Sequence, residues 1–140
     1  LDHFERIELN ARNICGETAF MIACRKGHKD VVKLLQDHSD PIIDLNARNN
    51  FGKTALMFAC FFGYKDVVQL LLEHSERIDL NARSNSGRNA FMIACRRGHQ
   101  NVVKLLLEYS EVVDINIPES FHLPEEIKNL LEFHSMLLQK

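Results

Sequence analysis

Hydrophobic residues along the chain gather into short blocks that alternate with polar segments. Three successive cycles each hold two such blocks, separated by a glycine that is followed by histidine or tyrosine. The first blocks lie at residues 18–24, 54–60 and 89–95, and the second blocks at 31–35, 67–71 and 102–106. In the second block of the first cycle, Val31, Val32, Leu34 and Leu35 fall on one face of a helix with a period near 3.6. The pattern predicts two short helices in each cycle.

The limits of the first helix in each cycle are marked by residue types that begin and end helices. An N-cap residue precedes each first block, namely Thr18, Thr54 and Asn89. The side-chain oxygen of such a residue can accept a hydrogen bond from the exposed backbone N–H groups of the first turn. A glycine follows each block, at Gly27, Gly63 and Gly98. We expect the helix to end there, because glycine adopts a positive φ most easily.

The cycles are copies of one sequence. The segment Leu-Asn-Ala-Arg occurs three times, and its asparagine recurs at Asn10, Asn46 and Asn81, with Asn116 following at the same interval. Helices this short are not stable alone and must bury their apolar faces on neighbouring copies. We therefore expect an all-α solenoid of stacked helix-turn-helix pairs joined by extended, β-hairpin-like arms, with repeats at 10–45, 46–80 and 81–117.

The two ends of the chain depart from this pattern. Residues 1–9 align with the end of a second helix, so we interpret them as the tail of a preceding repeat, and a start at Leu1 rather than Met indicates an excised or processed piece. Residues 118–140 lack a first helix. Pro124 and two following glutamates favour a helix start. We predict a C-terminal cap helix with an inner face of Ile127, Leu130, Leu131 and Leu137.

The segment from Gly16 to His28 resembles the ankyrin signature Gly-x-Thr-Pro-Leu-His-x-Ala-Ala-x-x-Gly-His, and the other two copies match in the same register. Alanine replaces the family's proline at 19, 55 and 90, and methionine replaces its histidine at 21, 57 and 92. The resemblance covers about residues 1–117. It implies that residues 1–140 form one ankyrin-repeat domain with arms at right angles to the helices, and that the domain is a non-catalytic protein-interaction module.

Composition narrows the functional classes. The chain has 140 residues, 46% of them hydrophobic, with 17 Lys+Arg against 19 Asp+Glu for a net charge of −2. This hydrophobic content excludes wholesale disorder. The longest apolar stretch, from Ala55 to Tyr64, is too short to cross a bilayer, and no signal peptide opens the chain. A net charge near zero argues against a generic polyanion binder if the charge is evenly spread.

The thiols and imidazoles point to no cofactor, metal or catalytic site. Three cysteines share one position of the repeat, Cys24, Cys60 and Cys95, where we expect small buried packing residues. Cys15 falls in a turn and should be exposed, although nothing supports a reactive role. The histidines sit at helix ends and turns, among them His3, His28, His38, His74 and His99. Unpaired thiols favour a reducing, intracellular compartment, either cytoplasmic or nuclear.

The family resemblance implies that partners contact a concave face formed by the arm tips and the first helices. By position, the predicted partner-binding residues are Arg12, Arg25, Lys26, Arg48, Phe51, Lys53, Phe61, Phe62, Arg83, Arg88, Arg96 and Arg97. Six further positions belong to the same face, namely Ile14, Cys15, Glu17, Asn50, Asn85 and Ser86. The face then holds nine of the 17 basic residues and one of the 19 acidic residues. The charge is segregated, at about +8 on this face and about −10 elsewhere.

We hypothesise that this face of a monomeric protein clamps an acidic segment of a partner protein. A pocket of Phe51, Phe61 and Phe62 would take an apolar anchor, because exposed aromatic clusters without a partner are unfavourable. Arg25, Lys26, Arg96 and Arg97 would take flanking carboxylates or phosphates. The alternatives are a merely solvated face, a structural spacer or regulatory array within a larger multidomain protein, and a surface for anionic lipid or nucleic acid.

Overall fold

The computed structural model describes residues 8–38 and 43–139. Over these ranges the chain forms seven helices and no strand. The helices are α1 (Ala19–Lys26), α2 (Lys29–Asp37), α3 (Ala55–Phe62), α4 (Lys65–Glu73), α5 (Ala90–Arg97), α6 (Gln100–Leu107) and α7 (Glu125–Leu138). Of the predicted tail at 1–9, only Glu8 and Leu9 are described, and His3 lies outside the described residues.

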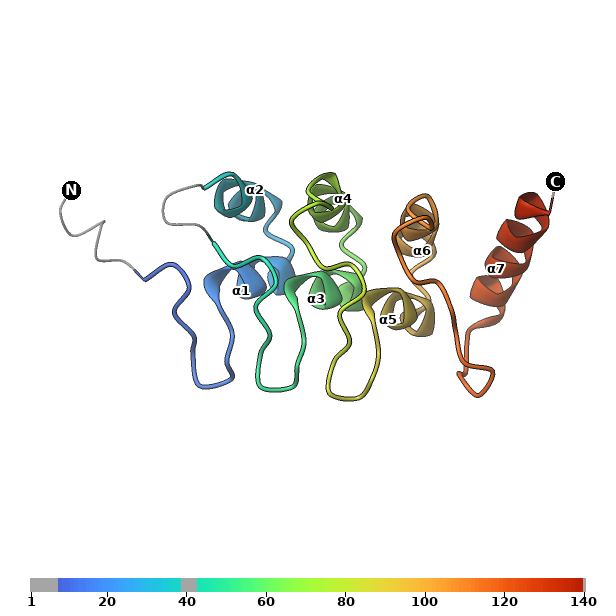
Figure 1. The fold of residues 1–140 in the computed structure, drawn as a ribbon, viewed down its shortest axis with the longest axis horizontal. Coiled ribbons are helices and arrows are strands. Elements are labelled where there is room, and N and C mark those ends of the chain that lie inside the picture. Colours follow the sequence, from blue (N-terminus) through green and yellow to red (C-terminus); the bar gives the residue numbers. More distant parts are fainter. Residues whose placement is uncertain (1–7, 39–42, 140) are drawn as a thin grey trace.

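The helices stack in two rows. Figure 1 shows α1, α3 and α5 side by side in one row and α2, α4 and α6 in another, with the arms projecting to one side. The predicted all-α solenoid of stacked helix pairs is confirmed. One pair falls within each of the segments 10–45, 46–80 and 81–117, whose limits as repeats stay a prediction.

The first helix of each pair begins and ends as the sequence predicts. The Thr18 and Thr54 side chains accept from the backbone N–H groups of Met21 and Met57, at 3.2 and 3.4 Å. The Asn89 side chain caps the third copy in the same way. Each helix then ends at a glycine in the left-handed conformation: Gly27, Gly63 and Gly98, with φ of 72°, 74° and 75°.

The core repeats along the solenoid axis. Side chains at four positions of the first helix are buried in every copy: Phe20, Leu56 and Phe91; Met21, Met57 and Met92; Ala23, Ala59 and Ala94; and Cys24, Cys60 and Cys95. The methionine that replaces the family's histidine is thus a packing residue here. Small side chains at the alanine and cysteine positions let α1, α3 and α5 approach one another closely.

The arms are hairpin turns tied to one another through their backbones. Within an arm, for example, the N–H of Asn49 donates to the Lys53 carbonyl at 2.9 Å. Between arms, the N–H of Asn50 donates to the Cys15 carbonyl and that of Asn85 to the Phe51 carbonyl, both at 3.0 Å. These bonds hold each arm at a set distance from the next.

The C-terminal helix α7 packs against α6 through the first part of its predicted inner face. Ile127 is fully buried, and Leu130 and Leu131 are half-buried against the core. The expected role of Leu137 is wrong, since 53% of it is exposed. The reason is length: α6 has 8 residues and α7 has 14, or about 12 and 21 Å at 1.5 Å per residue, so the last turns of α7 extend beyond α6.

The opposite end of the stack leaves apolar side chains uncovered. Val31 is 43% exposed, whereas Val67 and Val102, at the same position of later copies, are each 1% exposed. Leu34 is likewise exposed on α2. Within the described residues, α2 contacts α1 of its own pair and α4 of the next pair.

At Gly27 and Gly63, a side chain from the following copy lies against the helix-ending glycine. A Cβ on Gly63 would stand 2.6 Å from Nδ1 of His99, and the His99 ring is itself held by a 2.7 Å hydrogen bond between Nε2 and the Phe61 carbonyl. Gly87, in the third arm, also has a positive φ of 80°, but a Cβ there would meet nothing within 4 Å.

Gly63→Ala is therefore expected to lower the free energy of unfolding more than Gly87→Ala. Both variants bear the cost of a left-handed alanine, about 1 kcal/mol. Gly63→Ala must also displace the His99 ring, which adds about 1–3 kcal/mol. Urea unfolding of the two variants measures the difference, and equal losses would contradict the close approach.

One buried polar side chain interrupts the second row. Gln36 is 1% exposed, and its Nε2 donates to the Leu70 carbonyl at 3.1 Å. Its Oε1 is buried and has no hydrogen-bond partner among the described residues. Leu72 and Leu107 hold the same position in the later copies and are buried.

Gln36→Leu should raise the free energy of unfolding by less than about 1 kcal/mol, because removal of an unsatisfied buried acceptor at similar volume is partly offset by loss of the hydrogen bond to the Leu70 carbonyl. Gln69→Leu, on the half-exposed side of α4, is the control and should change it by less than about 0.5 kcal/mol. Thermal or urea unfolding checks both values. A destabilised Gln36→Leu protein would show that the amide is needed.

Candidate binding surface

The predicted concave face corresponds to the surface made by the arms and the last turns of α1, α3 and α5, which we call the inner face. All twelve predicted binding residues belong to these segments. Eight are exposed, namely Arg12, Lys26, Arg48, Phe51, Phe62, Arg83, Arg96 and Arg97. Four are half-buried, namely Arg25, Lys53, Phe61 and Arg88.

Three of the arginines join successive arms. Arg12 donates to the carbonyls of Arg48 and Gly16. Arg48 donates to the Arg83 carbonyl at 2.7 Å. Arg83 donates to the Gly87 carbonyl at 2.8 Å and pairs with Asp114 at 3.1 Å. These guanidinium groups are occupied by structural contacts, which the charge pattern alone did not reveal.

A fourth cation is neutralised within the first repeat. Arg25 pairs with Glu17, the one acid of the inner face, with 3.1 Å between Nε and Oε2. The remaining five cations are Lys26, Lys53, Arg88, Arg96 and Arg97. Among the described residues, none of them has a carboxylate within ion-pair distance. Three of these five cations, Arg88, Arg96 and Arg97, belong to the third repeat.

Two adjoining pockets lie where α3, α5 and the second and third arms meet. The first, which we call the aromatic pocket, has a volume of about 230 Å³ and is lined by Lys53, Met57, Phe58, Phe61, Phe62 and Ile93. The second, the cationic pocket, measures about 170 Å³ and is lined by Lys53, Phe61, Ser84, Ser86, Arg88, Ile93, Arg96 and Arg97. Lys53, Phe61 and Ile93 line both, so the pockets share a wall.

Aromatic rings orient the cations of this region. The Arg97 guanidinium lies over the Phe61 ring, 4.3 Å from its centroid, and the Lys53 ammonium lies 6.0 Å from the same centroid. The guanidinium groups of Arg88 and Arg96 each lie 5.4 Å from the centroid of Phe121. Cation–π contact holds a guanidinium by its face and leaves its N–H edges available.

The structure changes the predicted phenylalanine pocket. Phe61 and Phe62 are in edge contact, with centroids 4.9 Å apart, and both line the aromatic pocket. Phe51 lines neither pocket and is 63% exposed at the tip of the second arm. Ser86, at the same position of the third arm, lines the cationic pocket.

Sequence reasoning missed five lining or orienting residues, namely Met57, Phe58, Ser84, Ile93 and Phe121. Phe58 precedes Phe61 and Phe62 by three and four positions, so helical periodicity could have placed it on the same face. Ile93 lies at the same repeat position and could have been found likewise. Phe121 comes from the irregular segment before α7, where no repeat or periodicity indicates the direction of a side chain.

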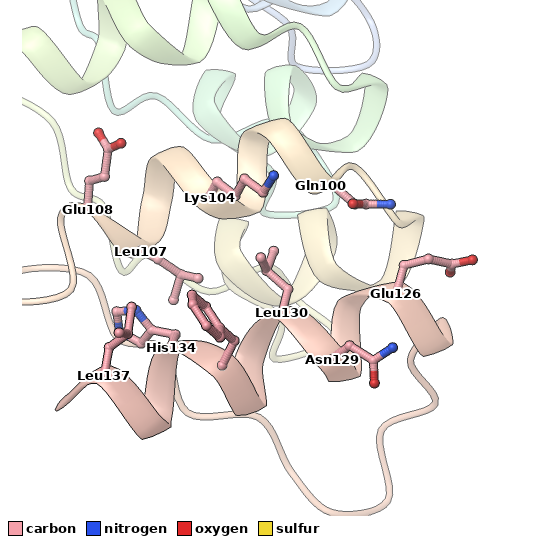
Figure 2. A pocket seen from close by; sticks show the side chains of 10 residues that line it. Gln100, Lys104, Leu107, Glu108, Glu126, Asn129, Leu130, His134 and Leu137 are labelled. Atoms are coloured by element: carbon pink, nitrogen blue, oxygen red, sulfur yellow. The ribbon is translucent and has the colours of Figure 1, made fainter. Parts of the chain in front are cut away.

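A separate groove of about 670 Å³ lies between α6 and α7, away from the inner face. Figure 2 shows Leu107 of α6 and Leu130 of α7 directed toward it, with Leu137 at one end. Glu108, Glu126 and Lys104 also line it. Two glutamates and one lysine therefore border the groove, which does not share the positive charge of the inner face.

The stacked cysteines are buried and free, and Cys15 is free and exposed. Burial raises the pKa of the Cys95 thiol to about 12 and raises those of Cys24 and Cys60 further. The neighbouring thiols contribute to the shift at Cys60. A buried neutral thiol is a packing residue rather than a nucleophile.

These shifts predict a loss of stability at alkaline pH. Thiols of the unfolded chain ionise near 9.0 while the native thiols stay protonated, so stability is constant well below pH 9 and falls as the pH rises toward 12. The expected slope is about 1.4 kcal/mol per pH unit for each buried thiol. Cys60→Ala should reduce the slope of the free energy of unfolding by about that amount. An unchanged slope would show that Cys60 ionises equally in both states.

No helix of the described chain is long and apolar enough to cross a membrane. Within the same residues, no group of three or more His, Cys, Asp or Glu side chains is placed to hold a metal ion. A family model described as ankyrin repeats, in three copies, matches residues 2–84 and 41–119. No curated protein matches the chain.

Proposed function

The chain belongs to the ankyrin repeat family, and from this membership we propose that its inner face binds a segment of another protein. Ankyrin repeats are generally protein–protein interaction modules, and proteins built from them are typically non-catalytic. The observation that carries the proposal is the junction of the aromatic and cationic pockets along a shared wall of Lys53, Phe61 and Ile93.

The aromatic pocket takes an apolar anchor of the partner. Its walls come from α3 and α5, whose backbones are held by stacking, so the pocket exists before a ligand arrives. Phe62 is 44% exposed at its border. Covering this aromatic surface favours association, because aromatic and arginine side chains supply much of the binding energy of protein interfaces.

The flanking part of the partner segment is acidic. Lys53, Arg88, Arg96 and Arg97 lie beside the anchor position and have no carboxylate partner among the described residues. The residues outside the inner face are mostly acidic and repel such a segment. The electrostatic field of the protein therefore directs the segment toward the inner face.

We further propose that the protein acts as a monomer inside the cell, in the cytoplasm or nucleus. Four free cysteines, three of them stacked in the core, support a reducing compartment.

Phe61→Ser with Phe62→Ser should abolish partner binding, because the double change removes the aromatic wall of the anchor pocket. Phe133→Ser is the matched control, since Phe133 is a 60% exposed aromatic on α7 outside the inner face. Both proteins should keep their helical circular dichroism. An affinity pull-down from cell lysate, quantified by mass spectrometry, compares them with the unchanged chain.

Arg96→Glu with Arg97→Glu should abolish the same interaction by reversing the charge of the cationic pocket. Lys29→Glu with Lys65→Glu makes an equal change of charge at exposed helix starts away from the pockets and should leave binding intact. Undiminished binding in both inner-face variants would overturn the proposal. If the chain instead captures nucleic acid or anionic vesicles in a salt-sensitive manner that does not depend on the phenylalanines, the inner face is a surface for polyanions. If the pull-down retains no protein at all, the result favours a structural spacer.

A further inference from the structure

The cationic pocket holds more positive charge than one carboxylate can neutralise. Lys53, Arg88, Arg96 and Arg97 line a volume of about 170 Å³. A carboxylate carries one charge and two oxygens, and a single arginine satisfies it through a bidentate contact. Four cations around so small a space indicate a ligand group with higher charge and more acceptor oxygens.

The arginines are held in an orientation suited to such a group. The guanidinium carbons of Arg88 and Arg96 each lie 5.4 Å from the centroid of Phe121, and that of Arg97 lies 4.3 Å from the centroid of Phe61. Among the described residues, none of these three guanidinium groups is in an ion pair, so their N–H groups remain to donate to a ligand. The rings also reduce the side-chain freedom that binding would otherwise remove.

Two hydroxyl groups complete the donor set. Ser84 is 8% exposed, and its Oγ lies 2.9 Å from Oγ of Ser86, with either atom able to donate. This bond uses one of the two hydroxyl hydrogens and leaves the other available. The pocket therefore offers a neutral O–H donor beside its charged N–H donors.

The arrangement is confined to the third repeat. Arg25, at the position of Arg96 in the first repeat, is paired with Glu17. In the second repeat, Phe61 takes that position and Phe62 takes the position of Arg97. Phe121 belongs to the segment that replaces a fourth arm, so the ring that orients Arg88 and Arg96 is present only at this end.

Resting on the proposed function, we propose that the cationic pocket recognises a phosphorylated serine or threonine of the partner segment, beside the apolar anchor in the aromatic pocket. A phosphoryl group carries about −1.5 to −2 charges at neutral pH and three acceptor oxygens. Its charge suits the four cations of the pocket, and its oxygens can accept from the guanidinium N–H groups and from the serine hydroxyl that remains available. The adjoining aromatic pocket favours a protein segment over a lipid headgroup, because it provides a separate recess for one apolar side chain.

Bead-bound libraries of short random peptides test this assignment. Three libraries differ at one fixed central residue, which is phosphoserine, serine or glutamate. The protein should select peptides from the phosphoserine library with an apolar residue at a constant offset. For a selected peptide, fluorescence polarisation should show binding weakened by about tenfold or more when the phosphate is removed.

Variants of the chain connect the selectivity to the pocket. Arg96→Gln and Arg97→Gln should each remove most of the preference for phosphoserine over serine. Lys26→Gln is the matched control, because Lys26 holds the position of Arg97 two repeats away and is exposed on the same face. It should keep the preference within about twofold, since it leaves the pocket's own charges in place.

The outcomes separate this inference from the proposal on which it rests. Selection of one anchor motif from all three libraries with equal affinity would overturn phosphoryl recognition and leave the proposed function standing. If the protein selects phosphoserine peptides with no preference for an apolar residue, phosphoryl recognition by the cationic pocket stands and the role of the aromatic pocket as an anchor site is contradicted. Binding to phosphatidylserine-containing vesicles, with no peptide selected from any library, would overturn both.

Discussion

Burial of each repeat's apolar face on the next repeat is the constraint on which the rest of this molecule depends. Helices α1 to α6 have 8 or 9 residues each, too few to be stable in water without tertiary contacts. Phe91 and Cys60, buried to 0% exposure, show how completely the first helices cover one another. The stack is thus the unit of stability, and no single helix pair is.

The same stacking creates the candidate site. Residues about 35 positions apart in sequence become neighbours, so that Lys53 and Phe61 of one repeat line a pocket with Arg97 of the next. Backbone bonds between arms, such as that from Asn85 to the Phe51 carbonyl, set the spacing of its walls. A binding site between repeats is as rigid as the contact that holds the repeats together.

The two ends of the stack differ in a way that matters for the site. At α2, which contacts α1 and α4, Val31 and Leu34 stay exposed. At the other end, α7 covers α6, and the preceding segment brings Phe121 against Arg88 and Arg96. The segment that precedes α7 in place of a first helix therefore contributes to the inner face, because its Phe121 ring lies beside two of the cations.

Sequence periodicity predicted the features that depend on local contacts or on exact repetition. The caps at Thr18 and Thr54, the glycine helix ends and the buried cysteine position follow from residue type and register, because these interactions span only a few residues or recur in each copy. The charge segregation was also visible, since it needs only the assignment of positions to a face.

Tertiary structure decided which of those charges are available. Arg48 and Arg83 are used to join arms, Phe51 stands apart from the pocket, and Leu137 extends beyond the helix it was expected to cover. Each outcome depends on the distance between side chains of different repeats or on the relative lengths of two helices. Periodicity specifies the face of its own helix on which a side chain lies. Only the packed structure determines which residues of other elements that side chain contacts.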